Sequence, residues 1–191
     1  MRQLYIIAGS NGAGKTTVSY TILPKILDCK EFINADEIAR GLSPFQPEKE
    51  NINAGRLMLT KIKRLLNAGV DFAFETTLST RSYVNLIQQA HDKGYFVTLL
   101  FFWLNTPDLA VKRVKTRVQE GGHDIPENII RRRYDSGLRN FFQLYIPISD
   151  NWLLIDNSGE PYQVIAEGIK DNTEIINRKI WNNIFKKHYE N

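Results

Sequence analysis

The sequence predicts an α/β fold, in which a mostly parallel, five-stranded sheet carries helices on both faces. Short apolar segments alternate with segments of helical character along most of the chain, and this alternation is typical of parallel sheets with crossover helices. The longest apolar run, residues 95–104, shows no polar alternation, as in a strand buried on both faces. With 191 residues, 42% of them hydrophobic, we expect a single domain over residues 1–191.

The first predicted strand and helix flank a glycine-rich loop. Residues 3–8 are apolar and stop at glycines, and residues 15–23 have helical character up to Pro24, whose ring and missing N–H disfavour a continuing helix. A second short strand is expected at residues 31–34. The polar segment after it reaches Pro44, which closes any local helix.

The longest predicted helix covers residues 47–68. Apolar residues recur in it at helical spacing, and Gly69 stands where a helix would stop. A third strand at residues 71–75 and a helix at residues 83–93 lead into the buried strand at residues 95–103. The recurring apolar residues of the long helix are Ile52, Leu59, Ile62 and Leu66.

Two further helices follow the buried strand. Thr106 is a typical N-cap, and Pro107 occupies the first helical position, so a helix begins there and ends at the glycines of residues 121–122. Pro126 starts the next helix.

The C-terminal third of the chain predicts one more strand and a separate unit. Residues 152–156 read as the fifth strand. Residues 162–191 have the pattern of a hairpin, with a turn at Asp171 and Asn172, followed by a closing helix.

Composition limits the compartment and the partners. The only cysteine, Cys29, cannot form an internal disulfide, which agrees with a reducing cytoplasm. Because no apolar run approaches the roughly 20 residues of a membrane-spanning helix, we expect a cytoplasmic protein without membrane segments. The net charge of +4 agrees with an anionic partner such as a nucleotide, a phosphosugar or a nucleic acid, and equally with a domain that binds no polyanion.

The segment "GSNGAGKTT" matches the phosphate-binding pattern G-x-x-x-x-G-K-[ST], with the required strand before it and helix after it. Its glycines let backbone N–H groups turn toward phosphate oxygens, and the helix presents its positive end to the same charge. Lys15 is expected to bridge the β- and γ-phosphates, and the Thr16 hydroxyl to bind Mg²⁺. The fold is therefore predicted to be that of a P-loop NTPase, with ATP as the nucleotide. The residues expected to bind it are Gly9, Ser10, Asn11, Gly12, Ala13, Gly14, Lys15, Thr16 and Thr17.

Two acidic residues follow predicted strands at the edge where ligands gather in open α/β sheets. Asp36 is the candidate general base, since a carboxylate within reach of an acceptor hydroxyl can take its proton; its structural alternative is to cap the following helix. Glu75 would hold an acceptor hydroxyl, support Mg²⁺ through water, or pair with a buried lysine or arginine. Thr76 and Thr77 would cap the next segment or donate to the acceptor.

A basic segment surrounds the two glycines between the fourth and fifth predicted helices, and we expect a small helical lid at about residues 117–133. Arginines that close over a transferring phosphoryl group stabilise its charge. Arg117 and one of Arg132 and Arg133 are the candidates for this catalytic role.

The same basic segment has structural interpretations. Its arginines would form a solvated face, or would pair with Glu127 and Asp135 one turn away. His123 is expected to form hydrogen bonds within the lid rather than to bind a metal ion.

Five blocks of the sequence, taken in order, resemble the zeta-toxin branch of P-loop small-molecule kinases. They are "GSNGAGKTT", "INADEIARGLSP", "FETTLSTRS", "GGHDIPENIIRRRYDSGL" and "WLLIDNSG". The resemblance extends to about Gly159, and five blocks in order are far more specific than the loop alone. It implies ATP-dependent phosphorylation of a hydroxyl group on a small molecule, and UDP-N-acetylglucosamine is the acceptor best associated with zeta toxins.

The resemblance also carries roles over to matching residues. These are Lys15 and Thr16 for nucleotide and metal, Asp36 as general base, Glu75 with Thr77 for the acceptor, and the adjacent Arg132 and Arg133 without a ranking. Toxins of this family usually have a helix before the first strand and a longer C-terminal part that binds the sugar nucleotide, whereas here the first strand begins at residue 3 and the sequence ends at residue 191. An antitoxin partner would follow from the resemblance, but no motif of the sequence itself supports one.

The sequence leaves three functions in order of preference. The first is a small-molecule kinase. The second is an ATPase or nucleotide-dependent switch, in which Glu75 positions water. The third is a nucleic-acid kinase or binder, ranked last because no stretch interleaves aromatic and basic residues as a stacking platform would.

Overall fold

The computed structural model describes residues 1–122, 124–170 and 172–188. The strands are β1 (Arg2–Gly9), β2 (Phe32–Ile33), β3 (Phe72–Thr76), β4 (Tyr95–Trp103), β5 (Asn151–Asp156), β6 (Gln163–Ile169) and β7 (Asn172–Ile175). The α-helices are α1 (Lys15–Lys25), α2 (Ala35–Leu42), α3 (Asn51–Ala68), α4 (Tyr83–Asp92), α5 (Pro107–Gln119), α6 (Glu127–Asn140) and α7 (Arg178–His188). A 3₁₀ turn, Pro47–Glu50, precedes α3, and a π-helical turn, Phe141–Tyr145, continues α6 into a second 3₁₀ turn, Ile146–Ile148.

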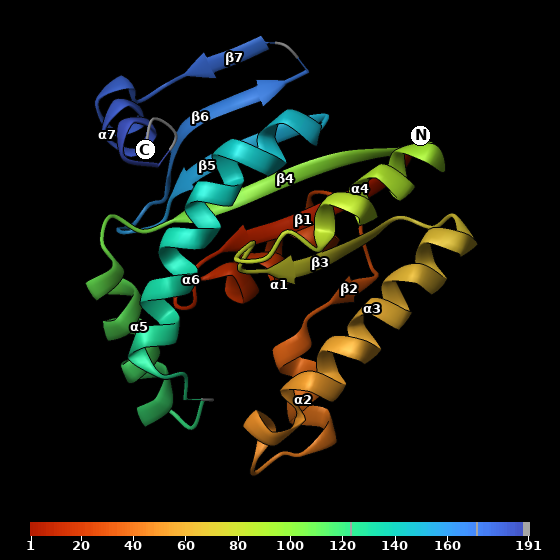
Figure 1. Ribbon diagram of the computed structural model, residues 1–191, viewed down its shortest axis with the longest axis vertical. Coiled ribbons are helices and arrows are strands. Elements are labelled where there is room, and N and C mark those ends of the chain that lie inside the picture. Colours follow the sequence, from red (N-terminus) through yellow and green to blue (C-terminus); the bar gives the residue numbers. More distant parts are fainter. Residues whose placement is uncertain (123, 171, 189–191) are drawn as a thin grey trace.

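Within the described residues the strands form one seven-stranded sheet in the order β2-β3-β1-β4-β5-β6-β7 (Figure 1). The pairs from β2 to β5 are parallel, and the ends of each predicted strand lie within one residue of the observed ones. The predicted α/β fold with a mostly parallel sheet is therefore confirmed.

The C-terminal hairpin is part of the sheet rather than an appendage to a five-stranded one. Strand β6 pairs antiparallel with β5, and β7 pairs antiparallel with β6. Trp181 of α7 stacks on Trp152 of β5 with ring centroids 5.8 Å apart, so aromatic packing fastens this unit to the core. Of the turn predicted at Asp171 and Asn172, Asp171 lies outside the described residues, and Asn172 begins β7.

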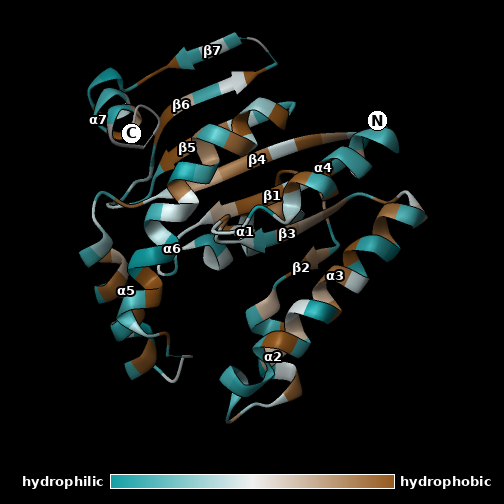
Figure 2. Ribbon diagram, in the orientation of Figure 1, coloured by the Kyte–Doolittle hydropathy of each residue, from teal (hydrophilic) through white to brown (hydrophobic). Residues whose placement is uncertain are grey.

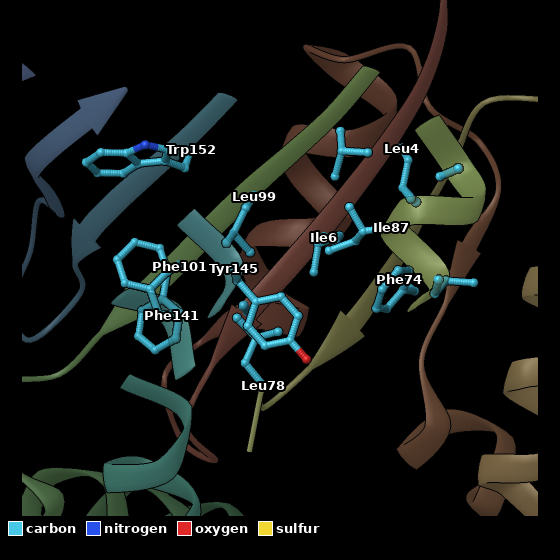
Figure 3. Close-up of a cluster of buried hydrophobic side chains, with 14 of the residues drawn as sticks. Leu4, Ile6, Phe74, Leu78, Ile87, Leu99, Phe101, Phe141, Tyr145 and Trp152 are labelled. Carbon is cyan, nitrogen blue, oxygen red and sulfur yellow. The ribbon is translucent and has the colours of Figure 1, made fainter. Parts of the chain in front are cut away.

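Both faces of the central strand β1 are buried. Leu4 and Ile6 point to one face, and Tyr5 and Ile7 point to the other, as the alternation of side chains along a strand requires. Helices α3, α4 and α7 pack on the first face together with the π-helical turn, whereas α1, α5 and the first half of α6 pack on the second. Hydrophobic residues gather along the central strands in Figure 2, and Figure 3 shows the cluster on the first face around Tyr145.

Two predictions about helices need correction. Helix α1 includes Pro24, because a proline this close to a helix end removes only one of the last hydrogen bonds. In α3 the predicted apolar stripe is only half right, since Ile52 is 72% exposed and Leu59 is 43% exposed. The buried residues of α3 are Ala54, Met58, Ile62, Leu65 and Leu66.

Two pairs of helices flank the carboxyl ends of the parallel strands. Figure 1 shows α2 and α3 on one side of these ends, and α5 with the first turns of α6 on the other. The loops that leave β1, β2 and β3 therefore open between the two pairs. In the parts of the chain that the structure describes, no helix combines the length and the hydropathy needed to cross a bilayer.

The corrected face of α3 can be tested with two matched variants. Ile62 is fully buried, so Ile62→Ala is expected to lower the free energy of unfolding by about 2–5 kcal/mol. Ile52→Ala removes the same atoms from an exposed position and should change it by no more than about 0.5 kcal/mol. Urea denaturation followed by circular dichroism measures both, and equal losses would contradict the assignment.

Candidate active site

The phosphate loop connects β1 to α1. Gly12 and Gly14 both have φ of 79°, a left-handed conformation that glycine adopts without steric cost. Helix α1 begins at Lys15, so its first N–H groups face the loop. Lys15 is only 6% exposed, and its Nζ donates to the carbonyl oxygen of Ser10 at 2.9 Å. The loop therefore already holds one positive charge inside it.

Asn157, directly after β5, supports the loop from outside. Its Nδ2 donates to the carbonyl oxygen of Ala13 at 2.8 Å, and a Cβ on Gly14 would lie only 2.5 Å from the same nitrogen. Glycine at position 14 is therefore required by its left-handed conformation, and a Cβ there would also displace the Asn157 side chain from Ala13. The role of Asn157 was not predicted from the sequence. Its position directly after a strand could have indicated a residue near the site, because ligands bind at the carboxyl ends of the strands in such sheets.

Glu75, near the end of β3, is buried against the loop. Its Oε1 lies 3.5 Å from Lys15 Nζ, with side chains 10% and 6% exposed respectively. Its Oε2 accepts a hydrogen bond from Thr16 Oγ1 at 2.8 Å. A buried carboxylate is stable only when it is paired and hydrogen-bonded, so Lys15 and Thr16 fix its position. The expected pairing with a buried lysine is thus present in the structure.

Asn34 is the N-cap of α2, and Asp36 is not. The side chain of Asn34 accepts from the backbone N–H of Asp36 at 2.8 Å, so the structural alternative for Asp36 is wrong. Asp36 instead lies in the first turn of the helix. Asn34 also donates from Nδ2 to Glu75 Oε2 at 3.0 Å and to Thr16 Oγ1 at 3.3 Å. The sequence pattern had predicted Asn34 only as the last residue of a strand.

A cavity of about 220 Å³ opens beside the loop. Residues of α1, α2, α3, β3, α4 and α6 contribute to its walls. Its polar and charged residues include Lys15, Asp36, Glu75, Thr77, Tyr83 and Arg133. The structure thus brings together the loop lysine, both predicted carboxylates and one lid arginine. The hydroxyl of Thr76 accepts from the backbone N–H of Leu78 at 3.0 Å, so Thr76 closes the turn.

The arginines of the basic segment have different surroundings. Arg133 lies at the cavity, and one of its terminal nitrogens donates to Asn11 Oδ1 in the loop at 3.2 Å. Burial lowers the pKa of Arg133, as does the neighbouring Arg132, while Asp36 acts in the opposite sense. Arg131 forms an ion pair with Glu127 at 2.8 Å. Pairing of an arginine with Glu127 was the structural role expected for this segment.

A second cavity of about 260 Å³ lies between the two helix pairs. It shares Asp36 and Arg133 with the first cavity, so the two are adjacent. Arg132 of α6 lies in one wall of this cavity, and Glu48 lies in the wall beside α2 and α3. Arg117, on α5, does not contribute to the walls of either cavity. The predicted hydrogen-bonding role of His123 lies outside the described residues.

Helix α6 is fastened to the strand ends just after Arg133. The hydroxyl of Tyr134 donates to the carbonyl oxygen of Leu104 at 2.5 Å. One turn later the backbone of Gly137 lies so close to Thr77 that a Cβ would be 2.3 Å from its carbonyl oxygen. These contacts fix where the arginine enters the cavity.

The strand, loop and helix around Lys15, with carboxylates at neighbouring strand ends, define a P-loop nucleotide-binding protein. The chain belongs to the zeta toxin family, which matches residues 2–146. An uncharacterized protein of Haemophilus influenzae is 31% identical over 126 residues, which are 66% of this chain and 88% of that protein. The resemblance to the zeta toxin family is therefore confirmed, and four of the five sequence blocks lie within the matched residues.

Solved structures share the fold. The complex of AvrRxo1-ORF1 and AvrRxo1-ORF2 with ATP has a TM-score of 0.77 and 16% identity; the match covers 96% of this chain and 63% of that one, so this chain spans less than two thirds of it. The structure from the PezAT toxin–antitoxin system of Streptococcus pneumoniae has a TM-score of 0.69 and 19% identity, and the match covers 99% of this chain and 79% of that one. A gluconokinase from Sinorhizobium meliloti has a TM-score of 0.53 and 12% identity, and the match covers 83% of each chain. With the family assignment, these findings confirm the predicted fold class, which is that of P-loop kinases.

The donor atoms around Thr16 suit a magnesium ion. The Thr16 hydroxyl and the Glu75 carboxylate are oxygen ligands 2.8 Å apart, and Mg²⁺ prefers one or two such ligands supplemented by phosphate and water. No group of three or more His, Cys, Asp or Glu side chains suited to a metal ion occurs among the described residues. The chemistry of this donor set therefore fits a metal that is held jointly by protein and nucleotide.

The steric requirement at the loop predicts the outcome of a single methyl substitution. Gly14→Ala is expected to weaken ATP binding at least about tenfold, because its Cβ would meet Asn157 and its φ is left-handed. Gly55→Ala is the matched control, since nothing lies within 4 Å of the added Cβ. Isothermal titration calorimetry with ATP measures the effect. Equal affinity in both variants would show that the loop tolerates the change.

Proposed function

We propose that this protein transfers the γ-phosphate of ATP to a hydroxyl group of a small molecule. The observation that carries the proposal is the cavity that Lys15 shares with the carboxylates of Asp36 and Glu75. A hydrolase needs room only for water beside the phosphate, whereas about 220 Å³ is available here. That volume is several times the roughly 30 Å³ that one water occupies in the liquid, so it leaves room for part of an organic acceptor.

ATP is the proposed phosphate donor. The loop offers backbone N–H groups and the Lys15 ammonium to the phosphates, and the similar AvrRxo1 complex was solved with ATP. Thr16 and Glu75 are the residues that would hold Mg²⁺, which neutralises charge on the β- and γ-phosphates when it is bound. Ser10, Asn11 and the neighbouring loop residues would enclose the phosphates.

Asp36 is the proposed general base. It lies in the first turn of α2 and at the junction of the two cavities, where the cap formed by Asn34 fixes the start of the helix. From there its carboxylate would take the proton of the acceptor hydroxyl as that oxygen attacks the phosphorus. Glu75 and Thr77, on the wall formed by the end of β3, would orient the acceptor.

The arginines are proposed to stabilise charge during transfer. Arg133 is the first choice, because it is already desolvated at the cavity beside the loop. Arg132 would bind negative charge in the second cavity. Arg117 would take part only when the lid of residues 117–133 moves toward the loop. We also propose that residues 117–133 form a lid, that residues 1–191 form a single domain, and that the protein is cytoplasmic.

A UDP-sugar, such as UDP-N-acetylglucosamine, is the proposed acceptor. The zeta toxin family supports it. The second cavity provides room, and Arg132 and Arg133 in its wall would pair with a diphosphate beside the carboxylates of Asp36, Glu48 and Asp124. An antitoxin partner is also proposed, because the similar PezAT structure comes from a toxin–antitoxin system.

A screen of acceptors tests the proposed function. The protein is incubated with ATP and Mg²⁺ together with UDP-sugars, free sugars or nucleosides, and mass spectrometry detects the gain of one phosphate. Transfer to at least one compound is expected. ATP turnover that no compound accelerates or captures would instead identify a hydrolase or switch.

Loss of the loop lysine should abolish turnover. Lys15→Ala removes the charge that would contact the β- and γ-phosphates, so the rate of ATP consumption is expected to fall at least about a hundredfold. Lys63→Ala, at an exposed position of α3, is the control and should match the wild type. Full activity of Lys15→Ala would rule out the loop as the phosphate site.

The role of Asp36 can be separated from nucleotide binding. Asp36→Asn keeps the shape of the side chain but cannot accept the proton, so kcat for transfer should fall by about 10²–10⁴ with unchanged ATP affinity. Glu37→Gln is the control, because the Glu37 carboxylate pairs with Arg40 at 3.4 Å on the same helix. Weaker ATP binding with unchanged transfer would contradict a role as general base.

A further inference from the structure

Asn34 lies where the two halves of the site meet. It follows β2, caps α2, and contacts side chains from α1 and β3. The residue is only 7% exposed. Its amide group is fully employed, because Oδ1 accepts from the backbone of Asp36 while Nδ2 donates to both Thr16 and Glu75.

Three side chains form a closed set of hydrogen bonds on the nucleotide side. Thr16 donates to Glu75 Oε2 at 2.8 Å, and Asn34 donates to that same oxygen at 3.0 Å. Asn34 also reaches the Thr16 hydroxyl oxygen at 3.3 Å. A single Oε2 therefore accepts two hydrogen bonds, and its orientation depends on both donors.

We propose that Asn34 is a positioning residue that couples the base to the phosphate side of the site. One end of its amide holds the first turn of α2, and with it Asp36. The other end holds the carboxylate of Glu75 and the hydroxyl of Thr16. A displacement of either group is thereby transmitted to the other, so the acceptor oxygen and the phosphate keep their relative alignment. This inference rests on the proposed function.

The residue type separates this role from ordinary helix capping. Asparagine, aspartate, serine and threonine all serve as N-caps. Aspartate has no donor when ionised and would place a second negative charge beside Glu75, while the serine hydroxyl sits on a shorter side chain. Of these caps, only asparagine carries its acceptor and its donor on separate atoms, so that Oδ1 can accept from the helix while Nδ2 reaches the carboxylate. The cap alone therefore does not explain the choice of residue.

Two substitutions preserve the cap and remove the coupling. Asn34→Ser should remain folded with a thermal midpoint within a few degrees of the wild type. Asn34→Asp, which adds a carboxylate beside Glu75, should remain folded with a lower midpoint. At about pH 8 both should lose at least about tenfold in kcat for transfer, with a smaller change in KM for ATP.

Asn53→Asp is the matched control. Asn53 donates from Nδ2 to Glu50 Oε2 at 2.8 Å on an exposed part of the molecule, so the same amide-to-carboxylate change is made beside a glutamate outside the site. It should leave kcat unchanged. Wild-type kcat in Asn34→Asp or Asn34→Ser, or an equal loss of kcat in Asn53→Asp, would each overturn the proposal.

The same variants distinguish this inference from the proposed function. If the wild type phosphorylates none of the acceptors, the proposed function fails, and the variants are compared in Mg²⁺-dependent ATP hydrolysis instead. A loss of hydrolysis in both Asn34 variants, with no loss in Asn53→Asp, then still supports Asn34 as the residue that positions Glu75 and Thr16. Hydrolysis rates equal to the wild type in both Asn34 variants would overturn it.

Discussion

The burial of Glu75 beside Lys15 is the constraint on which the site depends. A carboxylate that is 10% exposed is unstable without compensation, so the end of β3 must lie where the ammonium, the Thr16 hydroxyl and the Asn34 amide can reach it. These partners come from the start of α1 and from the segment after β2. One buried charge therefore ties three loops together before any ligand is considered.

The sheet order explains how such a site arises from a sequence in which its parts are far apart. Strand β1 lies between β3 and β4, and β2 lies beyond β3, so the loops after β1, β2 and β3 open side by side. The phosphate loop, the predicted base and the buried glutamate all occupy these loops. This arrangement is general in doubly wound sheets, where ligands bind at the carboxyl ends of the strands, and here it gives those loops one shared cavity.

The sequence predicted the parts of this structure that depend on local signals. Apolar runs, proline and glycine positions and the loop motif located the strands of the parallel sheet, the phosphate loop, and the acidic residues Asp36 and Glu75. What it missed depends on neighbours that are distant in the chain. The burial of Met58 rather than Leu59 follows from what α3 packs against, and the roles of Asn34 and Asn157 exist only once β3 and the loop lie beside them. Such contacts leave no periodic trace in a single sequence.

The anchoring of α6 holds Arg133 in place from both directions along the helix. From Tyr134 onward the helix is bonded and packed to the strand ends, and one turn earlier Ile130 is only 1% exposed in the cluster on the second face of the sheet. Arg133 lies between these two buried positions, beside the phosphate loop. A guanidinium held in this way loses little conformational freedom when an anion binds beside it, so a smaller entropic penalty opposes that binding.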